Sequence, residues 1–341
     1  MKEAFFDMVG NDELRRSLAA DITSQRLSHA YILEGARGSG KHMLSLRIAA
    51  ALACENRDRN DLPLPCMQCP ACKKILEGNS PDVIYINRSD KATLGVEAVR
   101  DLKSDVYVAP NDISTKIYII EEAHLMTTQA QNALLLTLEE PPSYVLFLLL
   151  CESTAPLLET IRSRAPTRRL EPIDPTCITR HLKTHVPEAK RMEEKELAEI
   201  VTAADGSIGR AIALLDPKLY KPIVDRRRAA REFVSFCMQK RNSSAVLRFL
   251  TSLGTKREEL TVQCNEILLC LRDLLLCKQT ENAPLCFFSD REEACSLSYT
   301  FTTPTLLALC DSVSRTIDKL RQNANVRLTL IAMATDCGLL Q

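Results

Sequence analysis

The sequence predicts an α/β domain built on a parallel sheet, followed by two regions that contain only helices. Two observations support this fold class. In the first half of the 341-residue chain, short apolar runs rich in β-branched residues alternate with segments of helical periodicity. After about Leu170 the strand signals stop, and the later segments with a clear pattern are helical.

Four runs have the composition of strands that are buried on both faces of a parallel sheet. They are residues 30–33, 83–86, 117–120 and 144–150. Helical patterns lie between them at residues 41–54, 95–106 and 128–138. Parallel strands need such crossover connections, so this alternation favours a parallel sheet over an antiparallel one.

The second half of the chain is punctuated by prolines. Pro172 and Pro175 mark the end of the α/β domain. A small helical unit follows and ends near Leu215. The later helices are longer and amphipathic, and one of them is predicted to begin with Thr303 as its N-cap and Pro304 as its first residue. We therefore expect three domains, at residues 1–172, 173–218 and 219–341.

The composition is that of a globular protein without net charge. Lys and Arg together number 44, as do Asp and Glu, and 45% of the residues are hydrophobic. A free-standing DNA-binding protein usually carries a basic excess, so we expect any contact with DNA to be local or shared with partners. The longest apolar run, residues 145–151, is too short to span a bilayer. We expect a cytoplasmic protein with no membrane contact.

Residues 35–41, Gly-Ala-Arg-Gly-Ser-Gly-Lys, follow a predicted strand and open a predicted helix, which is the context of a P-loop. Gly35, Gly38 and Gly40 let backbone N–H groups turn towards phosphates, and Lys41 would reach their outer oxygens. A plain glycine-rich turn is the alternative. The next residue of a P-loop is Ser or Thr, whose hydroxyl helps to hold Mg²⁺. Here it is His42, and imidazole is a poor substitute for an oxygen ligand.

Two acidic residues, Glu121 and Glu122, follow the strand predicted at residues 117–120. In an ATPase site the first acid is usually Asp and acts on Mg²⁺, whereas the second orients the attacking water. Glu121 is one methylene longer than Asp, and Glu122 stands where the base would be. Taken alone, such a pair is more often the beginning of a helix. His42 and Glu121 together argue against hydrolysis, so ATP with Mg²⁺ is a doubtful ligand.

The sequence contains fourteen cysteines, of which ten are scattered among apolar neighbours as reduced thiols would be. The other four are clustered. Cys66, Cys69 and Cys72 form two overlapping C-x₂-C spacings, and Cys54 precedes them by twelve positions. Four thiolates can close a tetrahedral zinc site, which is then structural and not catalytic. An iron–sulfur cluster and four unligated thiols are the alternatives.

Four segments follow one another in a distinctive order. An N-terminal motif at residues 6–11 precedes the P-loop, the cysteine module at residues 54–72 comes next, and residues 132–142 (NALLLTLEEPP) complete the set. Together they resemble the AAA+ clamp-loader subunits of bacterial DNA polymerase III, over about the first 215 residues. The resemblance implies an AAA+ P-loop domain with a parallel sheet and a zinc module, then a small helical lid domain and a C-terminal all-helical collar domain.

The resemblance also assigns roles to two arginines. Arg164 matches the arginine of the family's Ser-Arg-Cys motif, although Ala165 replaces the cysteine. In that family this arginine is a finger that reaches into the ATP site of a neighbouring subunit. Arg210 matches the second sensor, which would contact the subunit's own nucleotide. Without the motifs, either arginine would be interpreted as part of a surface ion pair.

The resemblance favours one type of subunit over another. The ATP-hydrolysing subunits place a threonine pair at about Cys151 and Glu152, and residues 155–164 look closer to delta-prime than to gamma. We therefore expect a delta-prime-type subunit of a hetero-oligomeric ring, which helps to load the sliding clamp onto primed DNA, offers Arg164 to an ATPase neighbour and has no polymerase chemistry of its own. A gamma-type ATPase motor is one alternative. A zinc-containing nucleic-acid-binding module is another, but zero net charge and 5% aromatic residues argue against it.

Overall fold

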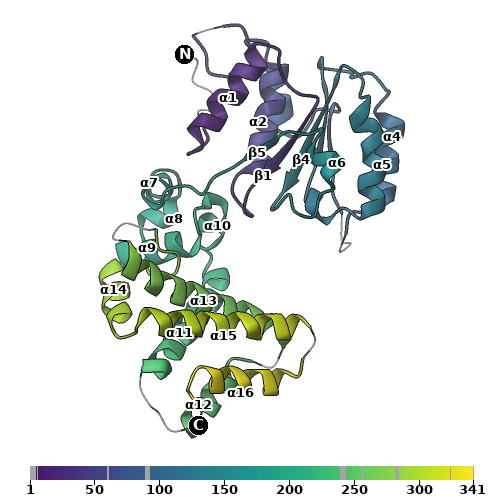
Figure 1. The fold of residues 1–341 in the computed structure, drawn as a ribbon. Helices are drawn as coiled ribbons and strands as arrows, with labels where there is room; N and C mark the ends of the chain where they lie inside the picture. Colours follow the sequence, from purple (N-terminus) through teal and green to yellow (C-terminus); the bar gives the residue numbers. More distant parts are fainter. Residues whose placement is uncertain are drawn as a thin grey trace. The chain divides into compact units, whose positions relative to one another are not determined.

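The computed structural model describes residues 5, 7–59, 61–88, 93–238, 243–254, 256–280, 284–322 and 324–340. The chain divides into two compact units (Figure 1). The first consists of Met1–His181 and Gly206–Arg210, and the second of Leu182–Asp205 and Ala211–Gln341. The division into three domains at residues 172 and 218 stays a prediction.

A five-stranded parallel sheet in the order β2-β3-β4-β1-β5 forms the middle of the first unit. The strands are β1 (Ala30–Glu34), β2 (Val83–Ile86), β3 (Lys116–Ile120), β4 (Val145–Cys151) and β5 (Thr167–Arg169). Every residue of β1, β3 and β4 is buried, as expected for strands covered on both faces. The four predicted strands are therefore confirmed. The fifth, β5, is a short edge strand whose polar residues gave no signal.

Helices cover both faces of the sheet (Figure 1). They are α1 (Asp12–Thr23), α2 (Lys41–Ala53), α3 (Pro70–Leu76), α4 (Val96–Asp105), α5 (Thr128–Glu139) and α6 (Glu159–Arg162). The first three share a core with Leu33 and Leu148, and the last three pack on Tyr118 and Phe147. Successive strand residues point to opposite faces, so β4 supplies side chains to both cores. Because the strands are parallel, the loops that follow β1, β3 and β4 meet at one edge of the sheet.

The second unit is helical throughout its described residues. The remaining helices of the chain are α7 (Pro175–His185), α8 (Pro187–Lys190), α9 (Glu194–Ala203), α10 (Ile208–Ala213), α11 (Pro217–Met238), α12 (Ser243–Ser252), α13 (Arg257–Gln279), α14 (Arg291–Tyr299), α15 (Thr303–Arg321) and α16 (Val326–Asp336). Fully buried side chains such as Phe233, Leu271 and Val313 form the core around α13. The predicted cap of α15 is wrong by one residue, because Thr302 accepts the hydrogen bond from the Thr305 N–H at 3.3 Å.

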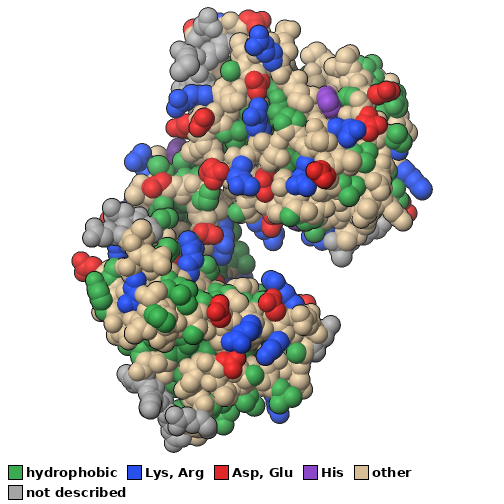
Figure 2. All heavy atoms as spheres, in the orientation of Figure 1, with side chains coloured by type: hydrophobic (Ala, Val, Ile, Leu, Met, Phe, Trp, Pro, Cys, Tyr) green, Lys and Arg blue, Asp and Glu red, His purple; other side chains and the backbone are tan. Residues whose placement is uncertain are grey.

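No helix among the described residues is long and apolar enough to cross a membrane. On the face drawn in Figure 2, acidic and basic side chains are interspersed over both units. That mixture accords with the zero net charge of the chain.

Candidate functional site

The phosphate loop connects β1 to α2 at the carboxyl edge of the sheet. Gly38 and Gly40 have φ angles of +77° and +96°, which residues with side chains rarely adopt. A side chain at Gly38 would also collide with a neighbouring segment. An added Cβ would lie 2.6 Å from Ser207 Oγ and 3.0 Å from the Arg210 backbone nitrogen. Position 38 therefore requires glycine for its conformation and for its contacts.

The short segment that contains Arg210 packs directly against the phosphate loop. The Gly209 N–H donates to the Gly38 carbonyl at 3.3 Å, and the Ser207 hydroxyl donates to the Arg37 carbonyl at 3.3 Å. The Arg210 N–H donates to Ser207 Oγ at 3.1 Å. The backbone of Arg210, the residue predicted as second sensor, thus lies beside the phosphate loop with which it would share a nucleotide. Arg210 is exposed.

Lys41 is bonded to its own loop. Its Nζ donates to the carbonyl oxygens of Gly35 at 2.6 Å and Ala36 at 2.8 Å. Burial lowers the pKa of Lys41, and the negative charge of Glu152 opposes that shift. In the same loop, Ser39 Oγ is buried without a hydrogen-bond partner among the residues that the structure describes. The loop thus offers an ammonium group and a hydroxyl that a phosphate could engage.

His42 and Glu121 occupy the side of the pocket where an ATPase holds its metal. His42 Nδ1 lies 2.9 Å from Glu121 Oε1, and the imidazole stacks on Tyr85 with ring centroids 5.5 Å apart. Mg²⁺ requires a nearly octahedral shell of oxygen ligands at about 2.0–2.1 Å. Position 42 offers no hydroxyl, and the imidazole engages the Glu121 carboxylate. These residues therefore do not fit Mg²⁺.

Glu122, the candidate base, is paired with an arginine that sequence analysis missed. Arg88 Nε lies 2.7 Å from Glu122 Oε2. The hydrogen bond from Arg88 lowers the pKa of Glu122. Glu122 also has a φ angle of +48°, which is uncommon for a residue with a side chain. Arg88 follows β2 by two residues, and that position at the carboxyl edge of the sheet is the signal that could have identified it.

The loops after β1, β3 and β4 enclose a pocket of about 460 Å³. Its lining includes residues of the phosphate loop, Arg37 among them, and both glutamates. His124 and Glu152 are further polar residues of the lining. Small-molecule sites typically have volumes of about 300–1,000 Å³. The structure thus brings together the predicted phosphate loop, both predicted acids and Glu152, one of the two positions where the resemblance places threonine in an ATP-hydrolysing subunit.

Arg164 lies just beyond α6 on the surface of the first unit. Its guanidinium is 2.7 Å from the Glu139 carboxylate and donates to the Thr160 carbonyl at 3.0 Å. Its side chain is 35% exposed. The following residue, Ala165, is fully buried in the core that α5 and α6 form with the sheet. The side chain of Ala165 thus points into the core, away from the surface on which Arg164 lies.

The four clustered cysteines come together at the opposite end of α2 from the phosphate loop. Cys54 follows the last turn of α2, and Cys69 caps the beginning of α3. All four residues are buried, and their sulfur atoms lie within 4.8 Å of one another. Cys66 Sγ and Cys72 Sγ are 4.0 Å apart, whereas Zn–S bonds of about 2.3 Å in a tetrahedron imply a separation of about 3.8 Å.

Hydrogen bonds in the cluster favour thiolates. The amides of Cys69 and Cys72 donate to the sulfurs of Cys66 and Cys69 at 3.4 Å, and Asn56 Nδ2 donates to Cys66 Sγ at 3.4 Å. Burial disfavours the Cys66 thiolate, but the bonds from Asn56 and the amides outweigh it and lower the pKa to about 6. Burial raises the pKa of Cys72. Four soft ligands with N–H donors around them fit a zinc ion, which would fasten α2 to α3 when bound.

The N-terminal segment is attached to α2 and to the cysteine loop. Arg47 Nε in α2 lies 2.8 Å from Asp7 Oδ2. The Phe5 N–H donates to the Leu64 carbonyl at 2.8 Å, and the Phe5 ring is buried in the same core as the four cysteines. Phe6, the first residue of the predicted N-terminal motif, lies outside the described residues. Asp7, in the described part of that motif, is therefore held by α2, whereas Phe5, just before the motif, is held by the loop that leads into the cysteine cluster.

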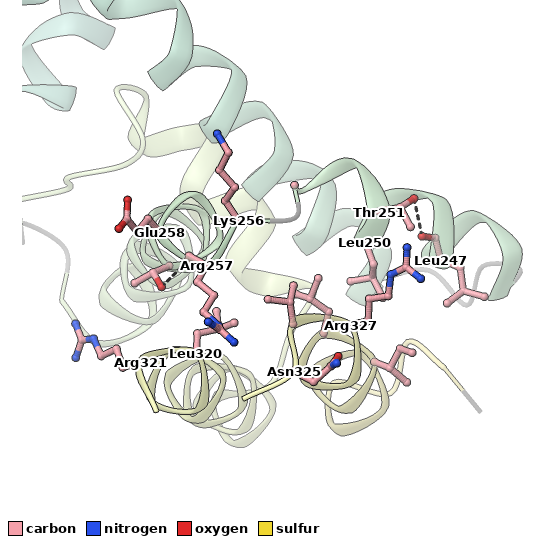
Figure 3. Close-up of a pocket in the computed structure, with 15 residues that line it drawn as sticks. Leu247, Leu250, Thr251, Lys256, Arg257, Glu258, Leu320, Arg321, Asn325 and Arg327 are labelled. Carbon is pink, nitrogen blue, oxygen red and sulfur yellow. Dashed lines mark hydrogen bonds between the residues drawn. The ribbon is translucent and has the colours of Figure 1, made fainter. Parts of the chain in front are cut away.

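A larger groove, of about 1610 Å³, lies in the second unit between α12, α13, α15 and α16 (Figure 3). Leu250 and Leu330 contribute buried apolar surface to its lining. Exposed basic residues, Lys256, Arg321 and Arg327 among them, border it. Sequence analysis did not identify this groove, because its walls come from four separate helices.

Comparisons with known proteins point to one part of the replication machinery. A family model described as "DNA polymerase III, delta subunit" matches residues 10–174. The chain is 30% identical over 275 residues to DNA polymerase III subunit gamma of Buchnera aphidicola subsp. Acyrthosiphon pisum, which covers 76% of this chain and 75% of that protein. It is 35% identical over 215 residues to DNA polymerase III subunit tau of Bacillus subtilis, over 63% of this chain and 37% of the relative. The chain thus spans about a third of the length of such tau proteins.

Solved structures give weaker likenesses. A DNA polymerase III gamma subunit-related protein from Thermotoga maritima aligns with 96% of this chain and 99% of its own, at 17% identity and a TM-score of 0.44. The DNA clamp loader delta protein of Bacillus subtilis aligns with 95% of this chain and 99% of its own, at 11% identity and a TM-score of 0.35.

Proposed function

Because the chain belongs to the family of AAA+ clamp-loader subunits of DNA polymerase III, we propose that it serves in such a complex as a subunit of the delta-prime type. It does not hydrolyse ATP itself. It helps the ring to load a sliding clamp onto primed DNA, and it offers Arg164 to the ATP site of a neighbouring subunit.

The state of the metal side of the nucleotide pocket carries this proposal. The His42–Glu121 contact of 2.9 Å engages the acid that an ATPase would direct at its Mg²⁺. Glu122, in the position of the base, is paired with Arg88 at 2.7 Å. Hydrolysis needs both a metal to neutralise the phosphates and a free group to orient water. This pocket therefore favours a subunit that does not turn over ATP.

The position of Arg164 supports its role as a finger. Arg164 is not among the described residues that line the pocket of its own unit. Among the described residues it pairs on the surface with one carboxylate, that of Glu139. The side chains of Arg164 and Glu139 are 35% and 44% exposed. Exposed pairs of this kind contribute about 0–1 kcal/mol, so exchanging Glu139 for a phosphate of a neighbour costs little. The planar guanidinium suits the transferring phosphoryl group.

In the proposed cycle, ATP binding by neighbouring subunits tightens the ring and holds the clamp open. Primed DNA then enters the complex and triggers hydrolysis, with Arg164 completing one active site in trans. Hydrolysis releases the clamp around DNA. The present chain contributes rigidity and one arginine to this sequence, and the cysteine cluster contributes a structural zinc site that stabilises its first unit.

The second unit is proposed to form a collar with neighbouring subunits, and the groove between α12, α13, α15 and α16 is the proposed contact surface. Its apolar lining and basic border suit a partner helix with apolar and acidic side chains.

We expect Ile331→Asp, which changes a lining residue that is 42% exposed, to abolish co-elution with the other subunits. Val262→Asp is the matched control, since Val262 is 44% exposed on α13 and does not line the groove. Equal co-elution of both variants would remove the groove from the interface.

The decisive experiment measures clamp- and DNA-stimulated ATP turnover by the reconstituted complex with Arg164→Ala. Removal of a finger costs about 10³-fold or more at the site that depends on it, although other sites in the ring dilute the total. Arg162→Ala is the control, because Arg162 is an exposed arginine two positions earlier. A clear drop for Arg164→Ala alone supports the proposal. Equal turnover in both variants would overturn it.

A gamma-type motor is the second candidate function. Relatives named gamma and tau, 30–36% identical to this chain, favour it, as does the presence of Lys41, Glu122 and Arg210. A motor would hydrolyse ATP as a purified chain in the presence of Mg²⁺. Turnover that disappears in Lys41→Ala would establish this function in place of the delta-prime type.

A further inference from the structure

We propose that the pocket at the carboxyl edge of the sheet binds a nucleoside diphosphate without a divalent cation. The inference rests on the proposed function in one respect, namely that this pocket does not hydrolyse ATP. It adds the class of ligand and the independence from metal. Three features of the pocket support it, and they concern the metal position, the phosphate loop and the balance of charge.

The metal position is already occupied by protein atoms. A P-loop protein uses the residue after the lysine and an acid after a neighbouring strand to hold Mg²⁺. Here these are His42 and Glu121, whose nitrogen and oxygen are 2.9 Å apart. The stack of His42 on Tyr85, with rings inclined by 24°, fixes the imidazole in place. A ligand that enters this pocket therefore has to bind without a metal between it and Glu121.

The phosphate loop, by contrast, retains what it needs to bind phosphate. The first turn of α2 contains no acidic residue, so the positive end of the helix is not neutralised there. Lys41 Nζ is bonded to two carbonyls of the loop, which a phosphate could replace as partners. Ser39 Oγ is buried without a partner among the described residues. These groups surround the place that the diphosphate of a nucleotide takes in a P-loop.

The balance of charge selects a diphosphate over a triphosphate. The lining contains two basic residues, Arg37 and Lys41, and three acidic ones, Glu121, Glu122 and Glu152. In an ATPase, Mg²⁺ offsets the charge of the outer phosphate. Without the cation, an additional phosphate would bring its negative charge close to the carboxylates after β3 and β4, where Coulomb repulsion is strong. A nucleoside diphosphate lacks that outer phosphate and therefore meets less of this repulsion.

The test titrates the full-length chain with ADP, GDP and ATP by calorimetry. The buffer is depleted of Mg²⁺ by treatment with a resin and contains no soluble chelator, because a chelator would also attack the cysteine cluster. We expect ADP or GDP to bind with a Kd that changes less than about twofold when Mg²⁺ is added, and ATP to bind at least about tenfold more weakly. Lys41→Ala should abolish binding of the diphosphate.

Two variants separate the metal position from the rest of the pocket. His42→Thr supplies the missing hydroxyl and frees Glu121, so Mg²⁺ should now tighten binding by about tenfold or more. His185→Thr is the control and should remain insensitive to Mg²⁺, since His185 lies in α7 and does not line the pocket.

Either of two results would overturn the inference: a wild-type Kd that falls about tenfold with Mg²⁺, or no binding of ADP or GDP by a chain that is folded by circular dichroism. Neither result bears on Arg164, which acts at another subunit's site. Conversely, failure of the Arg164→Ala experiment would leave the binding of a diphosphate standing, so the two proposals fail separately.

Discussion

The two ends of α2 carry two candidate ligand sites, and the sites differ in completeness. At its beginning lies the phosphate loop, where His42 and Glu121 are bonded to each other and Lys41 is bonded to its own loop. At its end lies the cysteine cluster, where four buried sulfurs converge within 4.8 Å. The sulfurs of one site converge as ligands of a zinc ion would, whereas the residues of the other are bonded to one another.

This difference separates what the fold needs from what catalysis needs. A closed Cys₄ site holds α2 and α3 together through its metal, so loss of one cysteine weakens the fold itself. The residues at which an ATPase holds Mg²⁺ beside its phosphate loop serve only hydrolysis. A subunit that leaves hydrolysis to its neighbours can therefore carry other residues there. Variants at the two ends of α2 and in the loop after β3 test this difference.

Replacement of a single cluster cysteine should have the largest effect. We expect Cys72→Ser to lose its bound zinc and to lower the free energy of unfolding by more than about 4 kcal/mol, because the site is buried and its ligands act together. Zinc content by mass spectrometry and denaturant unfolding measure the two quantities. Cys177→Ser, which changes a half-buried cysteine of α7 outside the cluster, is the control. Full zinc content in Cys72→Ser would refute the four-ligand site.

Steric pressure on the phosphate loop should have an intermediate effect. In Gly38→Ala the new methyl group would lie 2.6 Å from Ser207 Oγ, whereas in Gly78→Ala it would meet nothing within 4 Å. The φ angles of the two glycines are nearly equal, +77° and +73°, so the strain of the left-handed conformation cancels between the variants. We expect Gly38→Ala to be less stable than Gly78→Ala by at least about 1 kcal/mol in thermal unfolding. Equal stability would mean that the segment around Ser207 yields freely.

Neutralising Glu122 should have the smallest effect. The Glu122–Arg88 pair is exposed, and pairs of this kind contribute about 0–1 kcal/mol. We expect Glu122→Gln to change the melting temperature little and to leave the background ATP turnover of the purified chain unaltered. Loss of a measurable turnover in this variant would break the comparison, since it would identify Glu122 as a working base.

The first unit was largely predictable because its strands are buried on both faces and therefore read as apolar runs. Helix α2 also followed from the local pattern, which predicted a helix at residues 41–54 where the structure has one at Lys41–Ala53. The short strand β5 was missed, because three polar residues at a sheet edge need no apolar pattern. The cap of α15 was misplaced by one residue, since Thr302 and Thr303 are equally suited to the role and only the helix geometry decides between them.

The candidate site was predictable as a set of residues and not as a set of contacts. Sequence motifs identified His42 and Glu121 as departures, but the bond between them joins residues 79 positions apart and depends on how β3 pairs in the sheet. The attachment of Lys41 to its own loop and the pairing of Arg88 with Glu122 follow from side-chain conformation, which no spacing encodes. The convergence of the four cysteines was the exception, because short C-x₂-C intervals restrict where the sulfurs can lie.

The hydrogen bond from Phe5 to Leu64 has a practical consequence for work with this protein. It fastens Phe5, which immediately precedes the N-terminal motif, to the loop that leads into Cys66. We expect zinc in the cluster to order this loop, so a preparation with partial zinc occupancy would mix chains that hold the N-terminal segment firmly with chains that hold it loosely. We expect such a preparation to give a biphasic nucleotide titration, so that the metal content of each batch becomes part of any reported affinity.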